Sequence, residues 1–174
     1  LTKIVENNQV AFGDQHTRSS HNETTHKVIY TQKADKLTIM DGSSQIIFTI
    51  NANDQVVSYE QTYAGSVQVL GKERELISAQ RAVEVLYLAG RISSKATVQS
   101  VKLSYYQSLV LKDFSIYSPA WYIEIRQADG QLIARRVDAI HGTVLANVTL
   151  ETTNTQTQRT TTNNTTTTQS VQQQ

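Results

Sequence analysis

One amphipathic segment between two groups of strand-like runs limits the folds open to this chain more than any other feature. The segment is ISAQRAVEVLYLAG, residues 77–90. Ser78 is a good N-cap, and Ile77 before it can staple onto Ala82. The apolar positions and the glycine stop follow helical spacing: Val83, Leu86, Tyr87 and Gly90. The sequence therefore predicts one main amphipathic helix that lies across a sheet.

Strand-like runs precede and follow this helix. Before it come KVIYTQ, KLTIM, SQIIFTIN and QVVSYEQTY, separated by the turn formers Asp41-Gly42 and Asn53-Asp54. After it come TVQSVKLSYY, AWYIEIR and QLIARRVDAI, and Asp129-Gly130 joins the last two as a hairpin. Val101, Leu103, Tyr105, Trp121, Ile123 and Ile125 are expected to face inward. The intervening QSLVLKDFSIYSP is too apolar for a free loop, so it is expected to fold over the sheet or form an irregular edge, and Pro119 suits the start of a strand.

This order of elements indicates an α+β fold, an antiparallel β-sheet with one main amphipathic helix packed on it. Residues 1–26 are predicted as an N-terminal segment, helical at its start and a polar loop over residues 13–26. Residues 27–150 are predicted as one α+β domain, with a strand meander at 27–66 and the helix plus three strands at 72–150. Residues 151–174 are almost entirely Thr, Gln and Asn, and they are predicted to be disordered because they have little to bury.

The composition excludes several classes of protein. The chain has no cysteine, so disulfides, thiolate nucleophiles and cysteine-bound zinc are ruled out. Sixteen Lys and Arg against fifteen Asp and Glu, interspersed, indicate neither a nucleic-acid patch nor a surface for acidic partners. No run approaches the roughly 20 apolar residues of a membrane helix. Because the chain begins at Leu1 and its one methionine is Met40, we expect a processed or excised segment that an anchor or signal preceded.

The spacing of the candidate catalytic residues does not favour a catalytic site. Asp138 and His141 could belong to a triad, but three residues apart on a predicted strand they should point to opposite faces. His141 beside Gly142 reads better as a turn residue. Glu73 and Glu75 flank Arg74 before the helix, where negative charge is favoured without any catalytic role.

The candidate binding groups are no stronger. His16, His21 and His26 recur every five residues, which suits neither one helix face nor one strand side, so no metal site is predicted. Arg135 and Arg136 are adjacent on a predicted strand and so face opposite ways. There is no Gly-rich phosphate loop. The sequence therefore predicts no catalytic, cofactor-binding or metal-binding residue, and an enzyme is not expected.

The stretch SYEQTY, residues 58–63, is the most unusual of the strands. Val57, Tyr59, Gln61 and Tyr63 fall on one of its faces and Ser58, Glu60 and Thr62 on the other. Tyrosines can cover a core while their hydroxyls stay in water, so a half-buried strand is preferred to a binding site.

An ordered series of motifs resembles a known family. The motifs are QIIFTINANDQVVSYEQTY, ELISAQRAVEVLYLAGRI, VQSVKLSYYQSLV, YSPAWYIEI and VDAIHGTVL. In this order they resemble the YycI family of Gram-positive Firmicutes, and through it the related YycH, over about residues 28–146, with a weaker trace before residue 28. The helix followed by PAWYIEI and VDAIHGTVL also resembles the PepSY pattern, a helix on a small antiparallel sheet that ends in a D-A-x-x-G turn.

The resemblance implies a regulator with an α+β fold and no catalytic residues. YycI-like proteins are held in the cytoplasmic membrane by a single N-terminal helix, with the folded part outside. With YycH they associate with the sensor histidine kinase YycG, or WalK, and adjust its signalling to YycF, or WalR, which governs cell-wall metabolism. The membrane helix is missing from this sequence, and the Thr/Gln/Asn tail is outside the shared pattern.

The motifs also single out residues expected to be structural or to form an interface: Tyr59, Gln61, Tyr63, Tyr105, Pro119, Trp121, Asp138 and Gly142. Tyrosine and tryptophan can anchor a partner, and sheet edges offer strand addition as a second route to association. A PepSY-like protease inhibitor or cell-envelope binding module is the alternative function, and an envelope hydrolase is a further rival that lacks its constellation.

Overall fold

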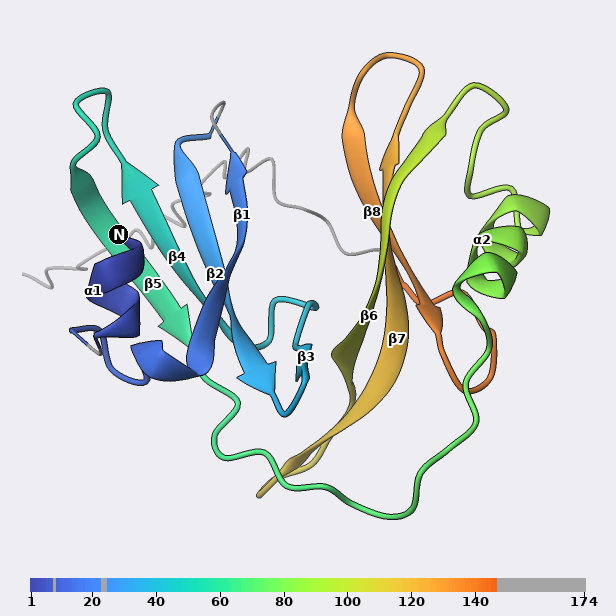
Figure 1. Ribbon diagram of the computed structural model, residues 1–174, viewed down its shortest axis with the longest axis horizontal. Coiled ribbons are helices and arrows are strands. Elements are labelled where there is room, and N and C mark those ends of the chain that lie inside the picture. The colour runs from blue at the N-terminus through green and yellow to red at the C-terminus, as the bar shows by residue number, and fades with distance from the viewer. Residues whose placement is uncertain (8, 23–24, 147–174) are drawn as a thin grey trace, which may run out of the picture.

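Two antiparallel sheets form the body of the protein in the computed structural model, which describes residues 1–7, 9–22 and 25–146 (Figure 1). The first sheet is built from the N-terminal half of the chain and the second from the C-terminal half. An extended segment, residues 63–78, connects them along the lower end of the molecule in Figure 1. The predicted disorder of residues 151–174 falls outside the described residues.

The first sheet has the strand order β1-β2-β4-β5, with the short β3 paired to β2 off this path. Its elements are α1 (Thr2–Glu6), the 3-10 helix η1 (Gly13–Gln15), β1 (His16–Asn22), β2 (Lys27–Ala34), β3 (Leu37–Thr38), β4 (Gln45–Ile50) and β5 (Val56–Thr62). The predicted turns are present, since Gly42 and Asp54 both have positive φ. The predicted helix at the start of the chain is α1.

Strand β1 corrects the prediction of a polar loop over residues 13–26. The sequence HTRSSHN has no apolar alternation, so it carries no strand signal. It is nevertheless an edge strand, antiparallel to β2 from His16 opposite Gln32 to Asn22 opposite Lys27. Pairing of its backbone with β2 therefore decides its conformation, and its side chains do not.

The core of the first sheet lies between α1 and one face of β2 and β4. Val5 of α1 and the following Val10 are buried against four strand residues, which are Val28, Tyr30, Ile46 and Phe48. The rings of Tyr30 and Phe48 meet edge to face, with centroids 5.8 Å apart. The alternation of buried residues along β2 and β4 is the period of a strand with one face on a core.

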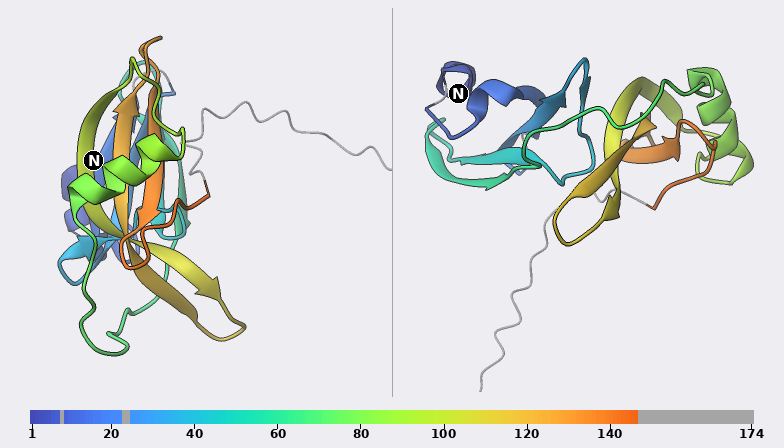
Figure 2. Two further views of the ribbon diagram at one scale, coloured as in Figure 1. Left: turned by 90° about the vertical axis from the view of Figure 1, so that its right-hand side faces the viewer. Right: turned by 90° about the horizontal axis from the view of Figure 1, so that it is seen from below.

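The second sheet has the order β6-β7-β8, and α2 crosses one of its faces (Figure 2). Its elements are α2 (Ala79–Leu88), β6 (Thr97–Val110), β7 (Ser115–Arg126) and β8 (Leu132–Asp138). The predicted cap is confirmed, because Ser78 Oγ accepts a hydrogen bond from the Arg81 amide at 3.1 Å. Gly90 ends the helix region with φ +66°.

The helix buries most of the face that its pattern predicted. Ala82 and Leu86 pack on Ile123, Ile125 and Val137, and Val83 is half-buried against the same core. Tyr87 differs, because its side chain is 61% exposed. Trp121 points inward as predicted.

The segment 107–119 is mostly paired strand, which corrects the expectation that it folds over the sheet or forms an irregular edge, although one register shift lies between Gln107 and Leu109. It continues β6 and β7 as a long hairpin, with residues 111–114 at its tip. Pro119 lies inside β7, and the strand tolerates it for a clear reason. The Pro119 carbonyl accepts from the Ala139 amide, so it faces the side of β7 on which β8 lies. The N–H that proline lacks would point to that same side, but β8 has already ended at Asp138, so no strand hydrogen bond is lost.

The α+β class with antiparallel strands is confirmed, but the single sheet is wrong. The strands divide into two sheets, each with its own hydrophobic cluster, and α2 packs on the second alone. Each half of the chain brings enough apolar strand residues to form a core without the other.

Candidate interaction interface

The outer strand of the first sheet exposes apolar side chains. Strand β5 lies at the end of the strand order, and no other strand of the described chain pairs with its outer side (Figure 1). Its Val57 is 59% exposed and its Tyr59 is 56% exposed, with Val56 exposed beside them. The prediction of a half-buried strand is therefore wrong, since Gln61 alone within β5 is partly buried.

Both outer strands of the first sheet have a register shift. In β1 it lies between Arg18 and Ser20, and in β5 it lies at Val57, because Thr49 and Ile50 pair with Ser58 and Val56. The edges of the second sheet are covered instead. The outer side of β6 meets residues 39 and 40 at Tyr105. Beyond β8, residues 143–145 return alongside it. Covering segments keep a sheet edge from pairing, so the open edges are those of β1 and β5. Of these two strands only β5 exposes apolar side chains, which makes it the better candidate for an added strand.

Two of the three polar side chains predicted on this face serve the fold. Gln61 Nε2 donates to the Ala11 carbonyl at 2.6 Å. Tyr63 donates from its hydroxyl to Gln15 Oε1 at 2.7 Å, and its ring stacks on Phe12 with centroids 4.2 Å apart. These contacts fasten the segment that leads into β1 onto the end of β5.

Tyr59 is held less completely. Its ring contacts Phe48 on β4, with centroids 6.0 Å apart and a 36° angle between the planes. More than half of the side chain remains exposed. An aromatic side chain supported on one side and open on the other suits an anchor for a partner, because it can bury a large area at low entropic cost.

The predicted residues of the second sheet do not join this surface. Trp121 packs with the core under α2, and its Nε1 donates to the Ile77 carbonyl at 2.9 Å. Tyr105 lies opposite Pro119 on the neighbouring strand. Both are half-buried, and both lie on the C-terminal half of the chain.

Asp138 and Gly142 shape the turn that follows β8. Asp138 Oδ1 accepts from the amides of Ile140 at 2.9 Å and His141 at 2.7 Å, and Oδ2 accepts from the Tyr106 hydroxyl at 2.8 Å. The Gly142 amide donates to the Asp138 carbonyl, and Gly142 has φ +68°, a conformation that favours glycine. The Asp138 carboxylate therefore fixes the turn after β8 and joins it to Tyr106 of β6.

The expectation that Asp138 and His141 face opposite ways is wrong. The strand ends at Asp138, and the turn brings His141 Nδ1 to 3.1 Å from Asp138 Oδ1. His141 is a turn residue, as predicted, and its side chain is largely exposed. Among the hydrogen bonds of the described residues, none joins a serine to this pair.

Burial and hydrogen bonding act in opposite directions on the Asp138 carboxyl. Burial raises its pKa, but the hydrogen bonds from His141, Tyr106 and Ile140 outweigh burial and hold the pKa below its ordinary range. For Tyr106, burial and then the bond to Asp138 raise the pKa to about 12. At neutral pH, Asp138 is therefore a carboxylate and Tyr106 a neutral phenol that donates to it, and the pair stabilises the turn.

The other candidate groups lie apart from one another. His16 is buried at the start of β1, whereas His21 and His26 are exposed. Within residues 1–7, 9–22 and 25–146, no group of three His, Asp or Glu is placed to hold a metal ion. Glu73 and Glu75 are exposed on the connecting segment, and the guanidinium of Arg136 lies 5.9 Å over the Tyr106 ring.

Sequence reasoning missed two apolar surfaces. One is a groove of about 660 Å³ between α2 and the start of β6, lined by Val83, Tyr87, Leu88, Ile92 and Val98 with the polar Gln80 and Glu84. The other is the tip of the β6–β7 hairpin, where Leu109, Val110, Leu111 and Phe114 are exposed. The apolar content of residues 107–119 was the available signal for the second.

These features define an α+β protein with an exposed strand edge and exposed apolar patches, surfaces of the kind through which proteins interact. The YycI protein family model matches residues 1–140, so the chain belongs to the YycI family. The match includes the residues before 28, where the motifs gave only a weaker trace, and it ends at residue 140, within the last motif. A search of curated proteins found no match to the chain.

The family places the chain among accessory regulators. YycI proteins are membrane-associated regulatory proteins of the YycG/WalK kinase system, and the family is not known as enzymatic. Within the part of the chain that the structure describes, no helix is long and apolar enough to cross a membrane.

Proposed function

We propose that this chain is the extracytoplasmic domain of a single-pass membrane regulator. It associates with a YycH-like protein and with the WalK/YycG sensor kinase, and it adjusts WalRK signalling that controls cell-wall metabolism. It acts by non-covalent association and carries out no reaction. Membership of the YycI family supports this role, since the family is an accessory family of that kinase system.

The exposed edge of β5 is the observation that carries the mode of association. An extended segment of the YycH-like partner adds to β5 as a further antiparallel strand, with backbone hydrogen bonds supplying affinity. Val57 and Tyr59 provide apolar contacts on one face of the added strand, and Tyr59 is the anchor. Gln61, Tyr63, Tyr105, Pro119, Trp121, Asp138 and Gly142 are the structural members of the signature set.

Regulation by such a domain requires only a difference in affinity. A partner shifts a kinase between two signalling states by the difference between its binding free energies to those states. Coupling of about 1–3 kcal/mol is typical and corresponds to roughly a 5–150-fold change in the equilibrium.

The proposal extends to the architecture. The unit formed by α2, β6–β8 and the turn after Asp138 is PepSY-like, a helix on a small antiparallel sheet closed by the D-A-x-x-G turn. The division of the chain into residues 1–26, 27–150 and 151–174 is part of the same proposal.

Binding of the 174-residue chain to a purified YycH-like extracytoplasmic domain tests the mode of association. Tyr59→Lys places a charge on the edge, and we expect it to weaken binding by at least about tenfold, as loss of an aromatic anchor does. Val69→Lys is the matched control, because Val69 is also an exposed apolar residue but lies on the connecting segment. Equal binding by the two variants refutes the β5 interface, and no binding by the unsubstituted chain refutes the proposed partnership.

A further inference from the structure

The connecting segment does little to fix how the two sheets are oriented. Residues 66–75 are all exposed, and Val69 reaches 87% exposure. Gly65 and Gly71 both have positive φ, and a Cβ on either glycine would meet no other atom within 4 Å. The hydrophobic clusters of the two sheets are also separate. The relative placement of the sheets must therefore depend on other contacts.

A short projection from the first sheet provides those contacts. It consists of residues 37–43, which begin with β3 and lie between the two sheets in Figure 1. Ile39 is completely buried and forms an isolated parallel bridge with Tyr105 of β6. The amide of Met40 donates to the Tyr105 carbonyl at 3.0 Å. The projection thus adds a short strand-like contact to the outer side of β6.

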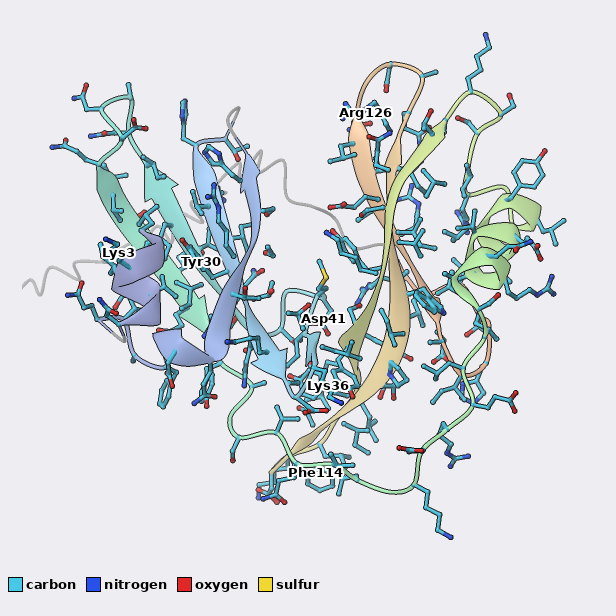
Figure 3. All side chains as sticks on the ribbon, in the orientation of Figure 1. Lys3, Tyr30, Lys36, Asp41, Phe114 and Arg126 are labelled. Carbon is cyan, nitrogen blue, oxygen red and sulfur yellow. The ribbon has the colours of Figure 1, made fainter. Side chains whose placement is uncertain are left out.

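The carboxylate of Asp41 connects the two halves at the end of this projection (Figure 3). Its Oδ1 accepts from the amide of Ser43 at 2.9 Å and from the hydroxyl of Ser43 at 2.6 Å. Its Oδ2 accepts from the amide of Gln107 on β6. Ser43 Oγ also lies 3.3 Å from the hydroxyl of Tyr117 on β7. One carboxylate therefore satisfies donors from both sheets.

The surroundings strengthen this attachment. Burial lowers the pKa of Arg136 on β8, and the negative charge of Asp41 acts against that decrease, so the two side chains are within electrostatic range. Hydrogen bonds to a charged acceptor are stronger than those between neutral groups. The buried Ile39 and a few polar contacts around one carboxylate are, however, a small interface compared with the cores on either side.

We propose that residues 39–43 form a latch, with the Asp41 carboxylate at its centre, which holds the two sheets in one of two relative orientations. With the latch closed, the sheets have the arrangement of Figure 1. With it open, the exposed connecting segment lets each sheet move as a folded unit with its own core. A partner that contacts both halves shifts the balance between these states, whereas one that prefers neither state shifts nothing.

Distance measurements between the halves test the latch directly. The chain contains no cysteine, so Ser58→Cys on β5 and Leu88→Cys on α2 accept one spin label each at exposed positions. In the labelled protein, pulsed electron paramagnetic resonance should give one narrow distance distribution. Adding Asp41→Ala should broaden that distribution and raise the open fraction by about tenfold or more, as expected for loss of hydrogen bonds to a charged group.

Matched variants keep the test decisive. Asp113→Ala removes an exposed carboxylate at the hairpin tip and should leave the distribution unchanged. If circular dichroism shows that Asp41→Ala unfolds part of the protein, Gln107→Pro replaces it, because this change removes the amide that donates to Asp41 and faces away from β7. An unchanged narrow distribution in a folded variant of either kind overturns the latch. A broad distance distribution in the labelled protein with Asp41 intact would also contradict the latch.

Discussion

Replacing Asp138 with alanine should lower the free energy of unfolding by about 3–5 kcal/mol. The buried carboxylate accepts from the amides of Ile140 and His141 and from the hydroxyl of Tyr106. Each hydrogen bond to a charged group contributes about 1.5–3 kcal/mol net. Three such bonds would sum to about 4.5–9 kcal/mol, but water can reach part of the turn after the substitution, so the loss should lie at or below the lower end of that range.

Asp138→Asn should cost less, about 1–2 kcal/mol, because the amide keeps the shape and one oxygen of the carboxylate. That oxygen can still accept from the two backbone amides, and the hydroxyl of Tyr106 can rotate to accept from the new NH₂ group. Asp113→Ala is the control, since Asp113 is exposed and its removal should change stability by no more than about 0.5 kcal/mol.

Urea unfolding followed by circular dichroism measures these differences, and repeating it at lower pH adds a check of the charge. Because the pKa of Asp138 is lower in the folded protein than its ordinary value of 3.8, the stability that the carboxylate contributes is fully present above pH 3.8. It is lost as the pH falls through the folded pKa. Equal stability of the alanine and asparagine variants would contradict a structural role of the carboxylate charge, and so would a loss of less than about 1 kcal/mol in the alanine variant.

Further predictions concern other buried groups. Burial lowers the pKa of His16 below 6.5, so the unfolded chain takes up a proton on this side chain more readily than the folded protein does. The stability that the neutral His16 contributes should be complete above about pH 6.5 and fall as the pH drops toward the folded pKa. Urea unfolding at several pH values should show this fall, and His16→Asn should abolish it. Burial raises the pKa of both Tyr106 and Tyr122 to about 12, so absorbance titration of the folded protein should show phenols still protonated at about pH 11, and complete ionisation by then would contradict it. Leu86→Ala should cost about 2–5 kcal/mol in urea unfolding, whereas Leu88→Ala at an exposed position should cost less than about 0.5 kcal/mol, and equal losses would show that the buried face of α2 is misassigned.

The elements with a clear local period could be predicted from the sequence. The α2 helix follows from its apolar spacing and its Ser78 cap, and the hairpin at Asp129-Gly130 follows from its turn residues. Strand β1 could not be predicted, because its residues are polar and its conformation depends on β2. The strands pair with their neighbours along the chain, but whether the two groups join into one sheet depends on pairing across the connecting segment 63–78, which no local pattern encodes.

The candidate interface shows the same limit. Alternation along β5 correctly places Tyr59 and Gln61 on one face, but it does not reveal that β5 is the outermost strand. Whether Tyr59 covers a core or faces solvent depends on that position. Likewise, two residues spaced three apart face opposite ways only if the strand continues through both. Because β8 ends at Asp138, the turn brings His141 close to Asp138 instead.

Hydrogen exchange of the chain, alone and in complex with a purified YycH-like extracytoplasmic domain, tests whether partners add to the free edge of β5. The amides of residues 56–62 should exchange more slowly in the complex, while those of β1 at the opposite edge should not change. Protection elsewhere without any change in β5, in a complex shown to have formed, would contradict it.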